Sequence, residues 1–188
     1  MKISNPLMEI SCQKYNNELE QALKNIEQFY YREAWMLDNQ KFEDWLSVFD
    51  TDVRYFMPIR RNHMRDDNDL EYSGFEDFAH FDEDLTSLQG RVRKHLYKTG
   101  WAENPPSRTR HMISNVFISS QPENDTYIVS SAFFVYRNRL ERQVDTFVGE
   151  RRDLLRRDQK SKLGFKIASR TILLDQSTIL SNNISLFF

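Results

Sequence analysis

Residues 29–59 of this 188-residue chain read FYYREAWMLDNQKFEDWLSVFDTDVRYFMPI. Apolar residues recur every three or four positions at the start of this stretch, which predicts an amphipathic helix, and the same spacing predicts a short second helix over residues 42–49. Residues 53–57 then read as a strand that stops at Pro58, because proline cannot donate to a sheet ladder. The stretch therefore predicts helix, short helix and strand in that order.

The first helix extends upstream of the quoted stretch, because the apolar spacing continues back to Leu19. Asn17 opens it, with Glu20 three residues later as the partner in a capping box. Asp38 and Asn39 end the helix, and residues 50–52 predict the turn before the strand.

The middle of the chain predicts a loop over residues 60–74 and a third helix over residues 78–96. Gly90 disfavours one continuous helix and leaves open a division into two, and Gly100 is the expected cap. Beyond Ser107 the apolar period changes to two, which predicts antiparallel strands joined by short turns. The expected strands cover residues 108–120, 126–140, 144–157 and 163–174.

Helices followed by a meander predict one α+β domain over residues 1–188. Its parts are a loose N-terminal arm, a mainly helical part with one strand, an antiparallel meander and a C-terminal tail (1–16, 17–106, 107–175 and 176–188). Strands this long must twist and curl, so the antiparallel sheet should wrap around the helices as a cone. A cone of this kind often leaves a pocket at its wide end.

Composition excludes several classes of function. Basic and acidic residues number 26 and 28, for a net charge of −2, so counterion release cannot drive nucleic-acid binding. No apolar run approaches a membrane span, and no signal peptide is evident in the first 30 residues. The single cysteine, Cys12, allows no intrachain disulfide. We therefore expect a cytoplasmic protein without membrane or nucleic-acid partners.

Four segments carry a resemblance to a known family, and together they cover most of the chain from residue 20 onward. They are the stretch quoted above, PSRTRHMISNV at 106–116, FVGERRDLLR at 147–156 and DQSTILSNNISLFF at 175–188. The chain resembles the small (β) subunit of bacterial aromatic-ring-hydroxylating dioxygenases of the biphenyl, benzene and cumene type. The resemblance implies the cone-shaped fold of nuclear transport factor 2, also called cystatin-like, with scytalone dehydratase and ketosteroid isomerase as cousins.

The same resemblance implies a non-catalytic role for this chain. The large α subunit of such enzymes carries a Rieske [2Fe–2S] cluster and a mononuclear Fe(II), and none of these cofactors is expected here. An α₃β₃ assembly is implied, with the β chains as a trimer. The complex would cis-dihydroxylate an aromatic hydrocarbon with O₂, using electrons from NADH through a reductase and a ferredoxin.

The cysteine, histidine and aspartate residues limit which metal sites this chain can form. A Rieske centre needs two cysteines and two histidines, and one cysteine excludes it. His80 and Asp82 have the spacing of an iron-binding pair, with His95 or His111 as a second histidine. The alternative is that Asp82 to Asp84 lie in the first turns of the third helix, where the helix dipole favours negative charge.

A second hypothesis is a stand-alone dehydratase or isomerase of the same fold. In it His111, beside Asn115 on a strand, acts as a general base in an apolar pocket, and Tyr30 or Asp38 completes the site. The competing interpretation is a structural histidine that ties its strand to a neighbour. A third hypothesis is a scaffold module with no oxygenase partner.

Aromatic and arginine residues are the interface candidates, because these residue types dominate contact energies between proteins. Trp35 and Trp45 lie near the apolar stripe of the helices and are expected in the core. The two terminal phenylalanines should dock on the chain's own sheet or on a neighbour. The full candidate set is Trp101, Arg108, Arg110, Arg151, Arg152, Arg156, Phe187 and Phe188.

Overall fold

A computed structural model describes residues 16–62, 71–97 and 103–188. In these ranges no helix is both long and apolar enough to cross a membrane. The elements along the chain are α1 (Asn17–Asp38), α2 (Phe42–Leu46), β1 (Phe49–Pro58), β2 (Ala79–Glu83), α3 (Leu85–Leu96), β3 (Arg108–Glu123), β4 (Thr126–Arg139), β5 (Gln143–Arg157) and β6 (Phe165–Leu174).

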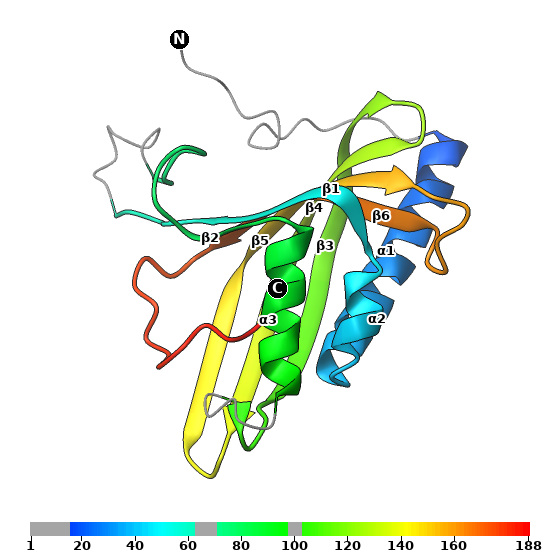
Figure 1. Cartoon of the computed structure of the whole chain (residues 1–188). Coiled ribbons are helices and arrows are strands. Elements are labelled where there is room, and N and C mark those ends of the chain that lie inside the picture. Colours follow the sequence, from blue (N-terminus) through cyan, green and yellow to red (C-terminus); the bar gives the residue numbers. More distant parts are fainter. Residues whose placement is uncertain (1–15, 63–70, 98–102) are drawn as a thin grey trace.

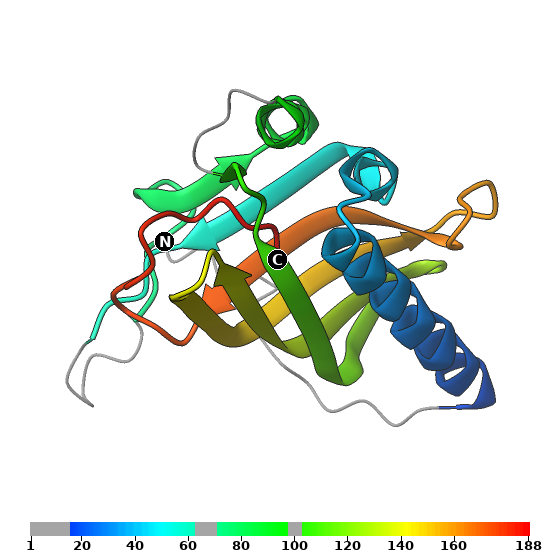
Figure 2. The same ribbon diagram turned by 90° about the horizontal axis from the view of Figure 1, so that it is seen from below.

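These strands form one curved sheet in the order β2-β1-β6-β5-β4-β3 (Figure 1). Its curve is open on one side, where α1 lies beside β3, α3 lies beside β1 and β2, and α2 contacts both α1 and α3 (Figure 2). The predicted α+β cone is therefore confirmed. One pairing differs from the expected antiparallel pattern, because β1 pairs with β6 in parallel.

The first helix begins as predicted, one residue away from the expected cap. Asn16, rather than Asn17, is the N-cap, and its side chain accepts a hydrogen bond from the Leu19 N–H at 2.9 Å. The turn predicted at residues 50–52 is wrong, because β1 already starts at Phe49. Phe49 lies opposite Ile167 of β6, so sheet pairing overrides the polar turn signal there.

The third helix is shorter than predicted. Residues 79–83 form β2, an edge strand that pairs antiparallel with β1 and was not predicted. The helix then runs without a break from Leu85 to Leu96 through Gly90. Asp84 caps its start, with its side chain 2.8 Å from the Ser87 N–H. The expected cap at Gly100 lies outside the described residues.

The core fills the inside of the cone, where α1 and α2 meet the concave face of the sheet. Trp45 is completely buried there, as predicted, whereas Trp35 is 57% exposed, so its placement in the core is wrong. The last residues of the sequence also lie inside the cone, and Figure 2 shows the chain end within the curve of the sheet. A candidate site is therefore expected at the wide end of the cone.

Candidate functional site

Asp38 and His111 meet at the wide end of the cone, as the dehydratase hypothesis required. His111 is buried on β3, and its Nδ1 lies 2.6 Å from Oδ1 of Asp38 at the end of α1. The same carboxylate accepts hydrogen bonds from the His111 main-chain N–H and the Thr109 hydroxyl, each at 3.1 Å. The other ring nitrogen, Nε2, lies 3.0 Å from the main-chain oxygen of Phe187.

This arrangement leaves neither ring nitrogen of His111 free for a substrate. Both nitrogens are taken up by structural partners, the Asp38 carboxylate and the Phe187 main-chain oxygen. A general base needs an unprotonated nitrogen within reach of its substrate. The cavity beside His111 has a volume of about 40 Å³. Pockets that hold an organic substrate have volumes of several hundred Å³. The contacts are those of a histidine that ties β3 to α1 and to the tail.

The other two residues of the hypothetical pocket lie elsewhere. Tyr30 is completely buried and donates its hydroxyl to Asp153 of β5 at 2.9 Å. Asn115 is exposed, has a φ of 51° and lies in an irregular part of the β3–β4 pairing. The irregularity breaks the strict alternation along β3, so Asn115 does not share the inward face with His111.

Deeper in the cone, Arg170 of β6 lies between two carboxylates. Its guanidinium donates to Glu33 of α1 at 2.5 and 3.0 Å and to Asp153 at 2.7 and 3.0 Å. All three side chains are fully buried. Arg151 adds a contact to Glu33 at 3.4 Å and lies over the Tyr30 ring. The interior that a substrate would need is therefore occupied by a paired ionic cluster.

The electrostatics of this cluster favour its charged state. Burial raises the pKa of Glu33, but Arg170 and Arg151 outweigh burial and the pKa is lowered overall. Burial lowers the pKa of Arg170, and the two carboxylates then raise it well above its usual range. Burial, with Asp153 second, raises the pKa of Tyr30. These three shifts all move the pKa away from neutral pH, where proton transfer would need it.

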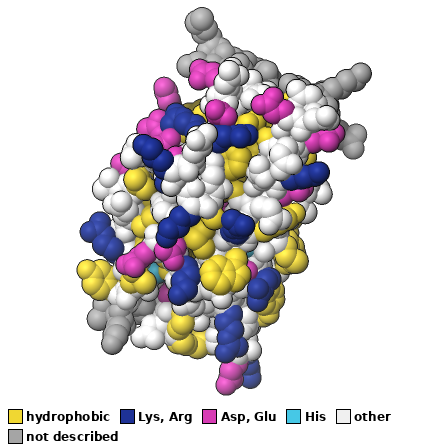
Figure 3. Space-filling model, turned by 90° about the vertical axis from the view of Figure 1, so that its right-hand side faces the viewer, with side chains coloured by type: hydrophobic (Ala, Val, Ile, Leu, Met, Phe, Trp, Pro, Cys, Tyr) yellow, Lys and Arg dark blue, Asp and Glu magenta, His cyan; other side chains and the backbone are white. Residues whose placement is uncertain are grey.

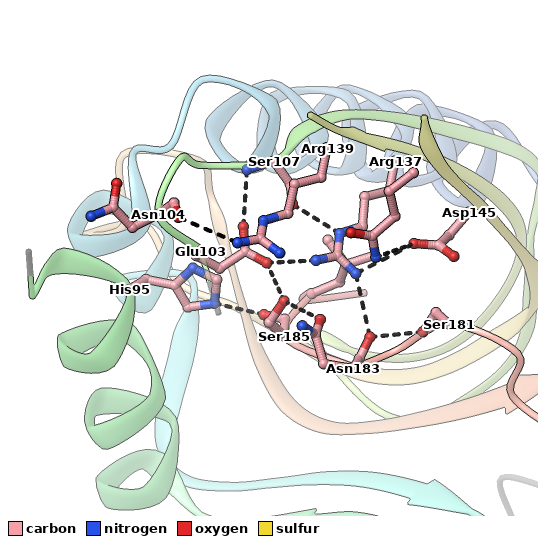
Figure 4. Close-up of polar contacts among 12 residues, drawn as sticks. His95, Glu103, Asn104, Ser107, Arg137, Arg139, Asp145, Ser181, Asn183 and Ser185 are labelled. Carbon is pink, nitrogen blue, oxygen red and sulfur yellow. Dashed lines mark hydrogen bonds and ion pairs between the residues drawn. The ribbon is translucent and has the colours of Figure 1, made fainter. Parts of the chain in front are cut away.

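A second polar network surrounds Arg137 of β4 at the rim of the cone (Figure 4). Arg137 is fully buried and donates to Glu103 and to the Ser107 hydroxyl, each at 2.9 Å. It also reaches Asp145 of β5 at 3.5 Å and the main-chain oxygen of Asn183 at 3.3 Å. The network therefore joins the connector before β3, the sheet and the tail.

Several of these buried charges were not predicted, although one signal was available. Arg137 and Asp153 occupy the same alternate positions as the apolar residues of β4 and β5 that face inward. A charged residue at an inward-facing position of a strand is buried, and buried charged residues are almost always paired. Glu33 gives a comparable signal on α1, because the residues three and four positions away are all apolar or aromatic: Phe29, Tyr30, Met36 and Leu37.

The predicted interface residues differ in their exposure to solvent. Phe187, Phe188 and Arg151 are at most 2% exposed, so in this chain they belong to the core rather than to a surface. The Phe188 ring docks on the chain's own sheet, as one of the two expected outcomes had it, whereas the Phe187 ring packs on α2 and α3. Arg152 pairs with Glu150, and Arg156 pairs with Asp50 and Asp52. Arg108 and Arg110 are exposed, and Trp101 lies outside the described residues.

The hypothetical iron ligands are separated. Asp82 lies on β2, rather than in the first turn of a helix, and binds Arg54 at 2.8 Å. His95 and His111 each contact a main-chain oxygen of the tail. Across the described ranges, no group of three or more histidine, cysteine, aspartate or glutamate side chains is arranged to hold a metal ion. The alternative of negative charge at the start of the third helix holds for Asp84, which caps α3, but not for Asp82, which lies on β2.

Comparison with known proteins identifies the family. The pattern of the ring hydroxylating beta subunit family matches residues 32–181. The chain belongs to this family of beta subunits. It is 56% identical to chlorobenzene dioxygenase subunit beta of Cupriavidus sp. strain PS12 and 53% identical to biphenyl 2,3-dioxygenase subunit beta of Rhodococcus jostii strain RHA1. Each alignment spans 163 residues and 87% of both chains.

Solved structures place this beta subunit in the expected fold. A chain of naphthalene 1,2-dioxygenase aligns with a TM-score of 0.79 at 22% identity, over 94% of this chain and 89% of that one. A protein of Novosphingobium aromaticivorans described as a scytalone dehydratase aligns with a TM-score of 0.62 at 13% identity, over 89% and 94% of the two chains. At these identities the likeness shows the fold alone. In the beta subunit, the interior of that fold is filled by charged pairs and by its own tail.

Proposed function

We propose that this beta subunit supports the large subunit of a dioxygenase that cis-dihydroxylates benzene-like or biphenyl-like hydrocarbons. The observation that carries this proposal is an identity of 53–56% to beta subunits of chlorobenzene, benzene and biphenyl dioxygenases, over 87% of both chains. The filled cone supports a structural role, because it offers no substrate pocket at His111. The subunit would act by holding its partner in place, since small displacements of a reactive centre are costly.

The reactive groups of such an enzyme would belong to the large subunit. A Rieske cluster needs two cysteines, and this chain contains one. The described histidines are bound to main-chain oxygens or stand apart from other ligands. The single cysteine therefore does not fit a Rieske cluster, and the residues within 16–62, 71–97 and 103–188 do not fit a mononuclear iron. We propose an α₃β₃ assembly in the cytoplasm, supplied with electrons from NADH by a reductase and a ferredoxin.

The outer face of β3, β4 and β5 is the proposed contact surface for another oxygenase subunit. Met112, Phe134 and Val148 lie opposite one another across these strands. Met112 and Val148 are 52% and 40% exposed, which is costly for apolar side chains in one row. Arg110 lies opposite Tyr136 on the same face, and its side chain is 69% exposed. Apolar residues flanked by arginine and tyrosine are typical of an interface core and its rim.

The face that carries α1 has charged side chains of both signs (Figure 3). Figure 3 views the right-hand side of Figure 1 and shows Lys and Arg side chains interspersed with Asp and Glu. No extended region of one sign is visible on this face. Such mixing supports the expectation that nucleic acid is not a partner, because its binding needs a clustered positive surface.

Co-expression with a Rieske-type large subunit tests the proposed function. With ferredoxin, reductase and NADH, we expect the two-subunit preparation to convert benzene or biphenyl to a cis-dihydrodiol. The isolated beta subunit should bind no iron and form no product. Stoichiometric iron in the isolated chain, or ring oxidation by it alone, would contradict the proposal.

A pair of variants tests the contact surface. Val148→Arg should reduce co-purification with the large subunit at least about tenfold, because it buries a charge in an apolar contact. Leu180→Arg, at a side chain that is 84% exposed on the tail, should leave co-purification unchanged. Equal effects of the two variants would show that this sheet face is not the contact.

A further inference from the structure

Five of the six main-chain oxygens of residues 183–188 are held by side chains from four different elements. Each contact joins a basic side chain to one carbonyl of the tail, at distances between 2.5 and 3.3 Å. The pairs, with the donor named first, are Arg137 to Asn183, His95 to Ser185, Arg91 to Leu186, His111 to Phe187 and Arg170 to Phe188. The donors come from β4, α3, α3, β3 and β6 in that order.

This pattern differs from the way the rest of the chain satisfies its backbone. Residues 183–188 belong to no helix or strand, so no sheet ladder or helical turn uses their carbonyls. Five of these six carbonyls instead bind guanidinium or imidazole groups, whose hydrogen bonds are strong when charge-assisted. The same arrangement is expected of a receptor that recognises an extended peptide ligand.

Two aromatic anchors complete the recognition. The Phe187 ring lies 4.5 Å from Trp45 and 5.2 Å from His95, between centroids, and Arg91 lies over it. The Phe188 ring lies 5.6 Å from Phe133 and 5.5 Å from Phe147. Buried aromatic anchors of this kind supply most of the affinity in peptide grooves.

The segment that connects β6 to these six residues is only loosely attached. Asp175, Thr178, Leu180 and Asn182 are exposed, and Leu180 is 84% exposed. Its polar contacts include exposed hydrogen bonds to Asn62 and Thr146 and an ion pair of Asp175 with Arg60, while Ile179 packs partly buried against the core. Exposed hydrogen bonds and few apolar contacts mark a region of low local stability.

We propose that the mouth of the cone is a peptide-binding site whose ligand is the chain's own segment Asn183–Phe188. The site recognises an extended backbone through the carbonyl donors and selects two consecutive aromatic side chains at positions 187 and 188. The connecting segment supplies only a high effective concentration of this ligand. The peptide is therefore separable from the receptor that binds it.

A cleavable full-length chain tests the proposal. A protease recognition sequence is inserted after Leu180, and the purified chain is cut and then mixed with fluorescent Asn-Ile-Ser-Leu-Phe-Phe. We expect the cut chain to stay folded, to retain its own peptide during gel filtration and to exchange it for the labelled one. The peptide Asn-Ile-Ser-Leu-Ala-Ala should bind at least about 100-fold more weakly, because both anchors are lost.

Two receptor variants on α3 provide a matched comparison. His95→Phe keeps the ring that packs on Phe42 and Phe187 but removes the donor to Ser185, and it should weaken labelled-peptide binding about fivefold. Arg93→Ala, on the exposed side of the same helix, should leave binding unchanged. A cut chain that unfolds, or one that stays folded but neither retains nor rebinds peptide, would overturn the proposal.

Discussion

Arg170 of β6 and Glu33 of α1 form a bidentate ion pair with no exposed surface on either side chain. The pair joins the first helix to the last strand across the interior of the cone. Because Arg170 also holds Asp153 and the Phe188 main-chain oxygen, one guanidinium satisfies three acceptors. The fold therefore depends on this arginine more than on any surface ion pair.

Replacement of Arg170 by methionine should lower the free energy of unfolding by about 3–5 kcal/mol, because two buried carboxylates lose their partner. Urea unfolding followed by circular dichroism measures the change. Arg54→Met breaks an ion pair whose partners are 41% and 47% exposed and should cost at most about 1 kcal/mol. Similar losses in both variants would contradict a special role for the buried cluster.

Phe187→Ala should destabilise the chain by about 3–5 kcal/mol, since it empties a buried aromatic site between α2, α3 and β3. Hydrogen exchange should show faster exchange at residues 183–188 than in the sheet. Leu180→Ala removes a side chain that is 84% exposed and should change stability by less than about 0.5 kcal/mol. If Phe187→Ala behaves like Leu180→Ala, the tail is not part of the folded core.

Substitution of two glycines by alanine should change the free energy of unfolding in opposite directions. A Cβ at Gly149 would lie 2.2 Å from the Leu173 main-chain oxygen and 3.0 Å from the Phe133 ring, so Gly149→Ala should cost about 1–3 kcal/mol or more. A Cβ at Gly90 would meet nothing within 4 Å, and alanine is the better helix former. Gly90→Ala should therefore raise stability by about 0.5–1 kcal/mol. Thermal unfolding at fixed pH compares the two, and a stable Gly149→Ala variant would show that the strands can separate.

Stability should fall as the solution becomes acidic, and His95 should cause the first part of the loss. Burial lowers the pKa of His95 below 6.5, so the unfolded chain takes up a proton that the folded chain resists. The loss therefore begins near the unfolded value and continues through the folded one. The pKa of Glu33 is lowered by Arg170 and Arg151 despite burial, so its contribution is lost later, below the ordinary value of 4.5.

The variant His95→Gln separates these two contributions. Glutamine can still donate to the Ser185 oxygen but does not titrate, so its unfolding free energy should be flatter between about pH 7 and about pH 5. The steeper loss at lower pH should remain. Superimposable profiles for the variant and the parent chain would rule out His95 as the group responsible.

The sequence predicts much of the fold because its periodicity is strong in α1 and in the four long strands. Alternation along β4 also places Arg137 inward, since residues 127, 129, 133 and 135 are buried apolar residues of the same parity. The pairing of Asp38 with His111 was one hypothesis among several. The structural role of His111 was the competing interpretation, but its partner at Nε2 could not be predicted, because that main-chain oxygen is 76 residues away along the chain.

Two features of the sheet could not be predicted from local patterns. The register of the β5–β6 pairing shifts between Leu154 and Leu155. As a result, the side chains of Ile167 before the shift and Arg170 after it both point into the cone. Strict alternation would have put Arg170 on the outside. β2 was missed because residues 79–83 are only partly buried and gain their strand conformation from β1. Both failures come from tertiary contacts that override local preference.

The parallel pairing of β1 with β6 has a consequence for protein synthesis. Phe49 leaves the ribosome early, but its neighbour Ile167 is translated more than a hundred residues later. The nascent chain therefore keeps one apolar strand without its neighbour until residue 167 has been made, a state in which chaperones bind. Folding of this part of the sheet is then limited by closure of this long loop.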